Sequence, residues 1–226
     1  MDAIRDDDHP MRQEALDLLI RRYWPPVYAC IRRMGHGREM AAELTQAFYA
    51  DVVLGRKLFS KADAGSGRVR SLLQTALKRY LIDQHRRRTS RPDQIGISLE
   101  DLVREEDYIA EVSDQDAGLV FERRWAMAIL EEALARTEKY YTDSARGHYW
   151  AAFDAFEIRP ATGAVDRPRQ SDLADQLGFP SALHVATAIS EVRKRLRLLL
   201  TEAVAETSAD PVDRKAEYER VVSLLS

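Results

Sequence analysis

The stretch Arg68–Arg88, RVRSLLQTALKRYLIDQHRRR, carries the pattern that decides the fold. Its apolar residues recur every three or four positions, so they share one face of a predicted helix. These residues are Val69, Leu73, Ala76, Leu77 and Tyr80. The other face is polar and cationic, because the stretch holds seven Lys or Arg and a single acid, Asp83. We therefore expect a helix that buries one side and presents a basic surface on the other.

The same helical period runs through most of the chain, with Gly and Pro between the periodic segments. Strand-like alternation is absent, so the predicted fold class is all-α. The motif WPP at Trp24–Pro26 is predicted to kink or break the first helix. The predicted helices cover residues 12–34, 38–54, 68–88, 121–141, 145–156, 171–177 and 181–205, and an amphipathic helix is expected in the tail 208–226.

Charge is divided unevenly along the 226 residues, although the net charge is only -3. Residues 61–91 hold nine Lys or Arg and two Asp, whereas residues 93–122 hold ten acids and one Arg. The acidic segment has few apolar residues, which is typical of a linker. The sequence predicts two small helical domains, 10–91 and 120–205, joined by an acidic linker at 92–119. A C-terminal tail, 206–226, follows them.

Composition excludes several classes of protein. The single cysteine, Cys30, excludes an internal disulfide and fits a reducing cytoplasm. The acidic N-terminus lacks a signal-peptide pattern, and no run approaches the roughly 18 apolar residues of a membrane span. The five histidines are scattered and no Gly-rich phosphate loop is present. We expect a soluble cytoplasmic protein that is not an enzyme, with no cofactor, no metal and no membrane contact.

The basic face of the stretch 68–88 has two interpretations. Cations at a helix C-terminus can simply complement the helix dipole in solvent. However, an ordinary exposed face intersperses Glu among the cations, and one acid beside seven cations favours contact with nucleic-acid phosphates. The polar side chains between the cations can both donate to and accept from bases. The expected contact residues are Arg68, Arg70, Ser71, Gln74, Thr75, Lys78, Arg79, His85, Arg86, Arg87 and Arg88.

The segment Gln170–Leu200 has the form of a helix-turn-helix. Gly178 is placed to end the short first helix and Ser181 to cap the second. A helical hairpin in a bundle shows the same apolar spacing, so that alternative stays open, but the basic second helix favours entry into a DNA major groove. The residues expected to face DNA are Ser181, His184, Thr187, Ser190, Glu191, Lys194 and Arg195.

Four blocks in order give the chain a family resemblance that spans about residues 14–205. They are YWPPVY at Tyr23–Tyr28, LTQ-F at Leu44–Phe48, LIDQHRR at Leu81–Arg87 and FERRWAMAILEEAL at Phe121–Leu134. On these blocks the sequence resembles the bacterial extracytoplasmic-function (ECF) sigma factors. These are the sigma-70-like, two-domain initiation subunits of RNA polymerase.

The resemblance implies a sigma region 2-like domain that melts the minus-10 element and a region 4-like domain that reads the minus-35 element. It also implies binding to core RNA polymerase at the β′ clamp helices and the β flap. The helix that carries LTQ would dock on the clamp helices, and the acidic linker would thread the polymerase's cationic RNA path. The implied polymerase contacts are Glu39, Glu43, Gln46 and Asp51.

Two further functions stay open. One is a helix-turn-helix regulator that acts without polymerase, although it would need neither a docking helix nor a long acidic tether. The other is a sigma-like protein held by an anti-sigma factor or another regulatory protein. The tail 208–226 is expected to pack against the region 4-like domain, and we hypothesise that it also controls access to DNA or binds a regulator.

Overall fold

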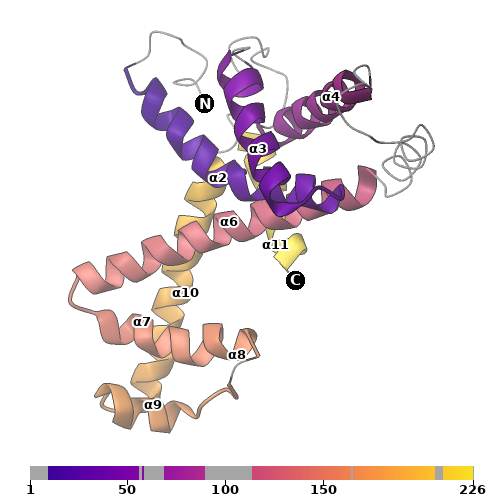
Figure 1. Cartoon of the computed structure of the whole chain (residues 1–226). Coiled ribbons are helices and arrows are strands. Elements are labelled where there is room, and N and C mark those ends of the chain that lie inside the picture. The colour runs from indigo at the N-terminus through magenta and orange to yellow at the C-terminus, as the bar shows by residue number, and fades with distance from the viewer. Residues whose placement is uncertain are drawn as a thin grey trace. The chain divides into compact units, whose positions relative to one another are not determined.

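The computed structural model describes residues 10–55, 58, 69–89, 114–163, 165–206 and 211–225. Nearly all of these residues are helical and none of them lies in a strand, which confirms the all-α class (Figure 1). The predicted linker lies outside the described residues up to position 113. None of the helices in the described ranges combines the length and apolar character needed to cross a membrane.

The chain divides into two compact units. The first comprises Met1–Ala128 together with Ala205–Ser226, and the second comprises Ile129–Val204. The division differs from the predicted one in two respects. The boundary between the units falls at residue 128 rather than 120, inside one helix, and the tail belongs to the first unit.

In the first unit, helices α2, α3 and α4 meet the N-terminal part of α6 and the tail helix α11. Their bounds are α2 Arg12–Arg33, α3 Arg38–Phe48, α4 Val69–Thr89, α6 Asp114–Asp143 and α11 Pro211–Leu225. A π-helical turn, Tyr49–Gly55, continues α3. The largest fully buried side chains in this unit include Trp125, Tyr23, Phe48 and Phe121.

The predicted break of the first helix is wrong, because α2 runs unbroken with Pro25 and Pro26 inside it. Neither proline can donate a backbone hydrogen bond, which weakens the helix locally. Pro26 and its neighbours Tyr23 and Val27 are buried in the core of the unit. Burial of these side chains offsets the missing hydrogen bonds and keeps the helix continuous.

The second unit contains the rest of α6 and four further helices. These are α7 Gly147–Phe153, α8 Arg159–Ala161, α9 Gln170–Leu177 and α10 Ala182–Ala205, with a π-helical turn at Asp154–Ile158 between α7 and α8. Phe153, Leu173, Val185, Ile189 and Val192 belong to one buried cluster. The two helices predicted at 171–177 and 181–205 are confirmed as α9 and α10, with Gly178 left-handed at φ 74° as the C-cap of α9.

The turn that follows α6 contains a strained alanine. Ala145 has φ 56°, and among the described residues it is the one non-glycine residue with positive φ. This conformation costs an L-residue roughly 1–2 kcal/mol. Ala145→Gly is therefore expected to raise the free energy of unfolding of the second unit by about 1 kcal/mol in urea denaturation. Ala135→Gly, at a regular exposed helical position, should lower it by about 1 kcal/mol, and destabilisation by both changes would contradict the assignment of strain.

Two buried tyrosines make the stability of the first unit sensitive to alkaline pH. Burial raises the pKa of Tyr23 and of Tyr49 well above the ordinary value near 10. Since the unfolded chain loses these protons first, the stabilisation is complete below about pH 10 and is lost as pH rises through the folded-state pKa. Above about pH 10 the free energy of unfolding should fall with a slope that approaches about 1.4 kcal/mol per pH unit for each tyrosine.

Urea unfolding between pH 9 and 11, followed by tryptophan fluorescence, measures this dependence. Tyr49→Phe should remove the contribution of one tyrosine and leave the effect of lysine titration in place. An unchanged slope in the variant would mean that Tyr49 does not ionise on unfolding in this range.

Candidate nucleic-acid interface

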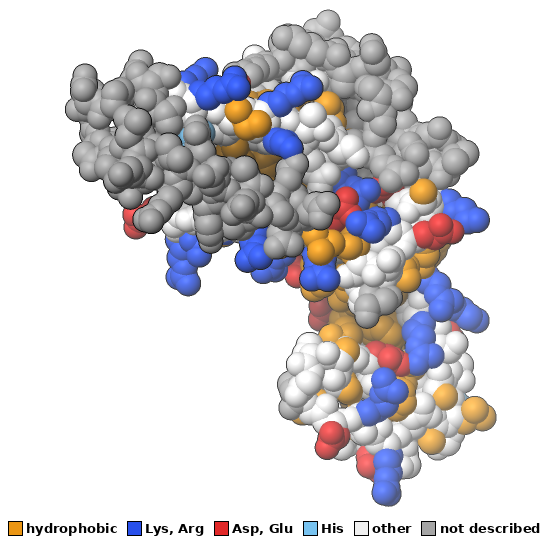
Figure 2. Space-filling model, turned by 90° about the vertical axis from the view of Figure 1, so that its right-hand side faces the viewer, with side chains coloured by type: hydrophobic (Ala, Val, Ile, Leu, Met, Phe, Trp, Pro, Cys, Tyr) orange, Lys and Arg blue, Asp and Glu red, His pale blue; other side chains and the backbone are white. Residues whose placement is uncertain are grey.

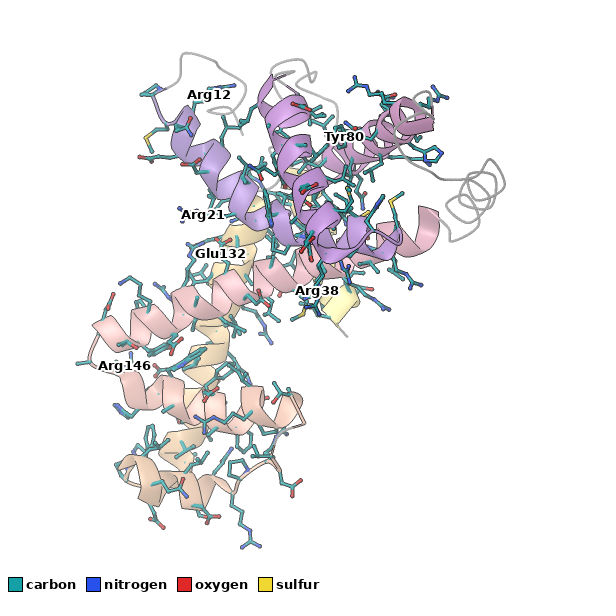
Figure 3. The ribbon with its side chains drawn as sticks, in the orientation of Figure 1. Arg12, Arg21, Arg38, Tyr80, Glu132 and Arg146 are labelled. Atoms are coloured by element: carbon teal, nitrogen blue, oxygen red, sulfur yellow. The ribbon has the colours of Figure 1, made fainter. Side chains whose placement is uncertain are left out.

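Helix α4 has the two faces that its sequence predicts. Val69, Leu73, Leu77 and Tyr80 are buried, and Tyr80, which is labelled in Figure 3, packs on Phe48 of α3. Their ring centroids are 5.7 Å apart. On the opposite side lie exposed polar and cationic residues, and Arg87 is exposed near the C-terminal end of the helix, in line with Tyr80 on the helical wheel. We call this exposed set the α4 basic face, and it consists of Ser71, Thr75, Lys78, Arg79, Arg86 and Arg87.

The other predicted residues of this helix are less exposed or lie outside the description. Gln74 and His85 are half-buried at the edges of the basic face. Arg68 and the side chain of Arg88 lie outside the described residues. In the view of Figure 2, Lys and Arg side chains are plainly more frequent than Asp and Glu among the described residues.

The expectation that Arg70 lies on the exposed face is wrong. Arg70 is only 4% exposed. Its Nη1 lies 3.0 Å from Oε1 of Glu122, and its Nη2 donates to Oε1 of Glu217 at 3.0 Å. The guanidinium also stacks on Trp125, 4.7 Å from the ring centroid. On a helical wheel Arg70 falls beside Leu77, at the edge of the apolar face, and the two carboxylates and the ring hold it there.

Arg70 is part of a buried ion cluster that joins three helices distant in sequence. Glu217 of α11 is 1% exposed, and Arg220 of the same helix donates to Oε2 of Glu122 through Nε at 2.7 Å. The cluster has Arg70 and Glu217 buried at its centre, with half-buried Glu122 and exposed Arg220 at its edge. It connects α4, α6 and α11, so the predicted tail helix is confirmed but packs in the first unit, not on the helix-turn-helix. No local sequence pattern links these residues.

Helix α3 presents an acidic surface. Glu39, Glu43 and Gln46 are exposed on α3, and Asp51 is exposed on the following turn. The helix faces its core with Ala41, Leu44, Thr45 and Phe48. All four residues expected to contact polymerase are therefore accessible, and three of them lie on α3. We call the four residues together the α3 acidic face.

In the second unit, α10 carries a line of exposed residues opposite its buried side. The line follows spacings of four, three, four and three, and we call it the α10 outer stripe. It consists of Leu183, Thr187, Ser190, Lys194 and Arg197, all exposed. Thr187, Ser190 and Lys194 were predicted to face DNA. Leu183 and Arg197 were not, although Leu183 lies four residues before Thr187 and Arg197 three residues after Lys194, which could have indicated both.

The remaining predicted residues of α10 make contacts within the second unit. Glu191 pairs with Arg146, which also stacks on Tyr149 at 4.1 Å (Figure 3). The guanidinium of Arg195 lies 3.9 Å from the ring centroid of Tyr140. Ser181 and His184 are exposed and hydrogen-bonded to each other, Oγ to Nδ1, at 2.9 Å. The expectation that Glu191 and Arg195 stand fully outward is wrong, because Glu191 pairs with Arg146 of the turn between α6 and α7 and Arg195 packs on Tyr140 of α6.

Comparison of the chain with protein-family models, with curated proteins and with solved structures found no match. The class of protein is therefore described from the structure alone. The chain is an all-α protein in which each of two units exposes a helix face with cations, and in which α3 exposes carboxylates.

Proposed function

We propose that this protein is an alternative sigma factor, which directs RNA polymerase to specific promoters. The observation that carries the proposal is the α4 basic face. Four cations, Lys78, Arg79, Arg86 and Arg87, are exposed on one helix, and the first three of them lie opposite its buried face. The single acid of this helix, Asp83, is half-buried.

A surface of this kind suits the backbone of opened DNA. Each cation that neutralises a phosphate releases a counterion, which drives binding without regard to sequence. Ser71 and Thr75 precede these cations along α4, and the Thr75 hydroxyl donates to the backbone oxygen of Ser71 at 2.9 Å while its lone pairs still accept. The α4 basic face therefore offers phosphate contacts together with polar groups that can reach a base edge.

The two other surfaces fit the same function. The α10 outer stripe ends in Lys194 and Arg197 and lies on an α-helix, which is the element that fits the major groove of duplex DNA. A sigma factor would read the minus-35 element through such a helix. The α3 acidic face suits a basic partner surface, and core polymerase is the partner that the family resemblance implies. Carboxylates there would be repelled by DNA, so α3 and α4 have separate partners.

Co-purification with core RNA polymerase tests the polymerase part of the proposal. The wild-type chain should elute with core enzyme, and Glu39→Lys with Glu43→Lys should weaken this association. Charge reversal at Glu14, which is exposed on α2, is the matched control. If the chain does not associate with core polymerase, with or without residues 208–226, it is not a sigma factor.

A helix-turn-helix regulator that binds DNA without polymerase is the second candidate. The α10 outer stripe favours it, because that surface needs no polymerase to read duplex DNA. Specific duplex binding by the chain alone, with no transcript after addition of core enzyme, would identify this function.

A further inference from the structure

We propose that Leu183 reads the C5-methyl group of a thymine in the major groove of the DNA. The inference rests on the proposed function of α10 as a DNA-reading helix and adds to it the chemical group that the helix recognises. It is carried by the composition of the α10 outer stripe, which is apolar at one end and cationic at the other.

Leu183 is the most exposed large hydrophobic residue among those the structure describes, at 74%. A single exposed leucine is common on protein surfaces, so exposure alone indicates little. What distinguishes Leu183 is its position in the first turn of α10, in line with Lys194 and Arg197. At about 1.5 Å per residue these cations begin roughly 16 Å further along the helix.

Leu183 has a second apolar group beside it on the α10 outer stripe. The hydroxyl of Thr187 donates to the backbone oxygen of Leu183 at 2.9 Å, so the Thr187 side chain lies next to Leu183 with its methyl group available for contact. The ring of His184 is hydrogen-bonded to the Ser181 hydroxyl through Nδ1. The N-terminal end of the stripe can therefore make an apolar contact through Leu183 and the Thr187 methyl group.

The major groove offers one apolar group that carries sequence information. Only thymine presents a methyl group there, whereas every other base edge presents donors and acceptors. Reading helices contact base edges with their N-terminal residues, and cations further along can bind phosphates. Leu183 and the Thr187 methyl group are thus suited to contact the methyl group of a thymine, while Lys194 and Arg197 are suited to bind phosphates of the DNA backbone.

The test removes the apolar group from the DNA, by replacing thymine with uracil, or from the protein, by Leu183→Ala. The full chain bound to core polymerase first selects tight-binding duplexes from a random pool. In the selected duplex each thymine is then replaced singly by uracil, which lacks only the C5-methyl group. At one position wild type should lose about fourfold in affinity, the value expected for one buried methyl group.

Leu183→Ala should show the same loss on the thymine duplex and no further loss with uracil at that position. Leu198→Ala, which truncates another exposed leucine of α10 at 48% exposure, should keep the uracil penalty. If the penalty is equal in wild type and Leu183→Ala, or absent at every thymine, the inference is wrong while the proposed function stands. If no duplex is selected at all, both are wrong.

Discussion

Glu217→Ala is expected to lower the free energy of unfolding of the first unit by about 3 kcal/mol. Glu217 is 1% exposed and accepts from the guanidinium of Arg70, which is itself buried. Removing one partner of a buried ion pair leaves a charge without compensation, which typically costs 3–5 kcal/mol. We take the lower end of about 3 kcal/mol because Glu122 still lies 3.0 Å from Arg70 in the variant.

Urea unfolding measured by the fluorescence of Trp24 and Trp125, both in the first unit, provides the measurement. Glu219→Ala is the matched control, because Glu219 lies on the same helix, is exposed and pairs with the exposed Lys215 at 3.9 Å. Its effect should stay within about 0.5 kcal/mol. Equal effects of the two substitutions would show that α11 is not anchored by the buried ion cluster.

Removing the four cations of the α4 basic face should cause the largest loss of DNA binding. In the combined variant Lys78→Ala, Arg79→Ala, Arg86→Ala and Arg87→Ala, the slope of log affinity against log salt should shrink. Each lost contact removes about 0.9 on duplex and about 0.7 on a single strand, so the total change is about 3. The measurement is promoter affinity of the chain with core polymerase from 50 to 300 mM salt.

Arg123→Ala with Arg124→Ala controls for the general loss of positive charge. Both arginines are exposed in the same unit, but on α6 and not on α4. Their removal should leave the salt slope close to that of wild type. A slope that changes in proportion to charge removed, wherever it is removed, would mean that α4 has no special role.

The sequence predicted the two faces of α4 because the helical period is a local property. Leu73 and Leu77 are buried and Lys78 and Arg79 exposed, as expected. Arg70 was wrongly predicted to be exposed because it lies at the edge of the apolar face. A helical wheel does not show whether another helix packs over that edge. Its partner Glu217 is 147 residues away, and no local pattern connects them.

The same limit explains the other differences. Pro25 and Pro26 predicted a broken helix from local chemistry alone, but burial of Tyr23 and Val27 keeps α2 continuous. On α10, Thr187, Ser190 and Lys194 are exposed as predicted. Glu191 was misassigned because the turn that carries Arg146 brings a cation against it.

Run-off transcription tests the central claim, that this chain directs polymerase to promoters, most directly. Core RNA polymerase is incubated on genomic fragments with the full chain, and the transcript ends are mapped. We predict discrete start sites that depend on the wild-type chain and disappear when Lys78, Arg79, Arg86 and Arg87 are replaced by alanine. Transcripts that do not change on addition of the chain would contradict the claim.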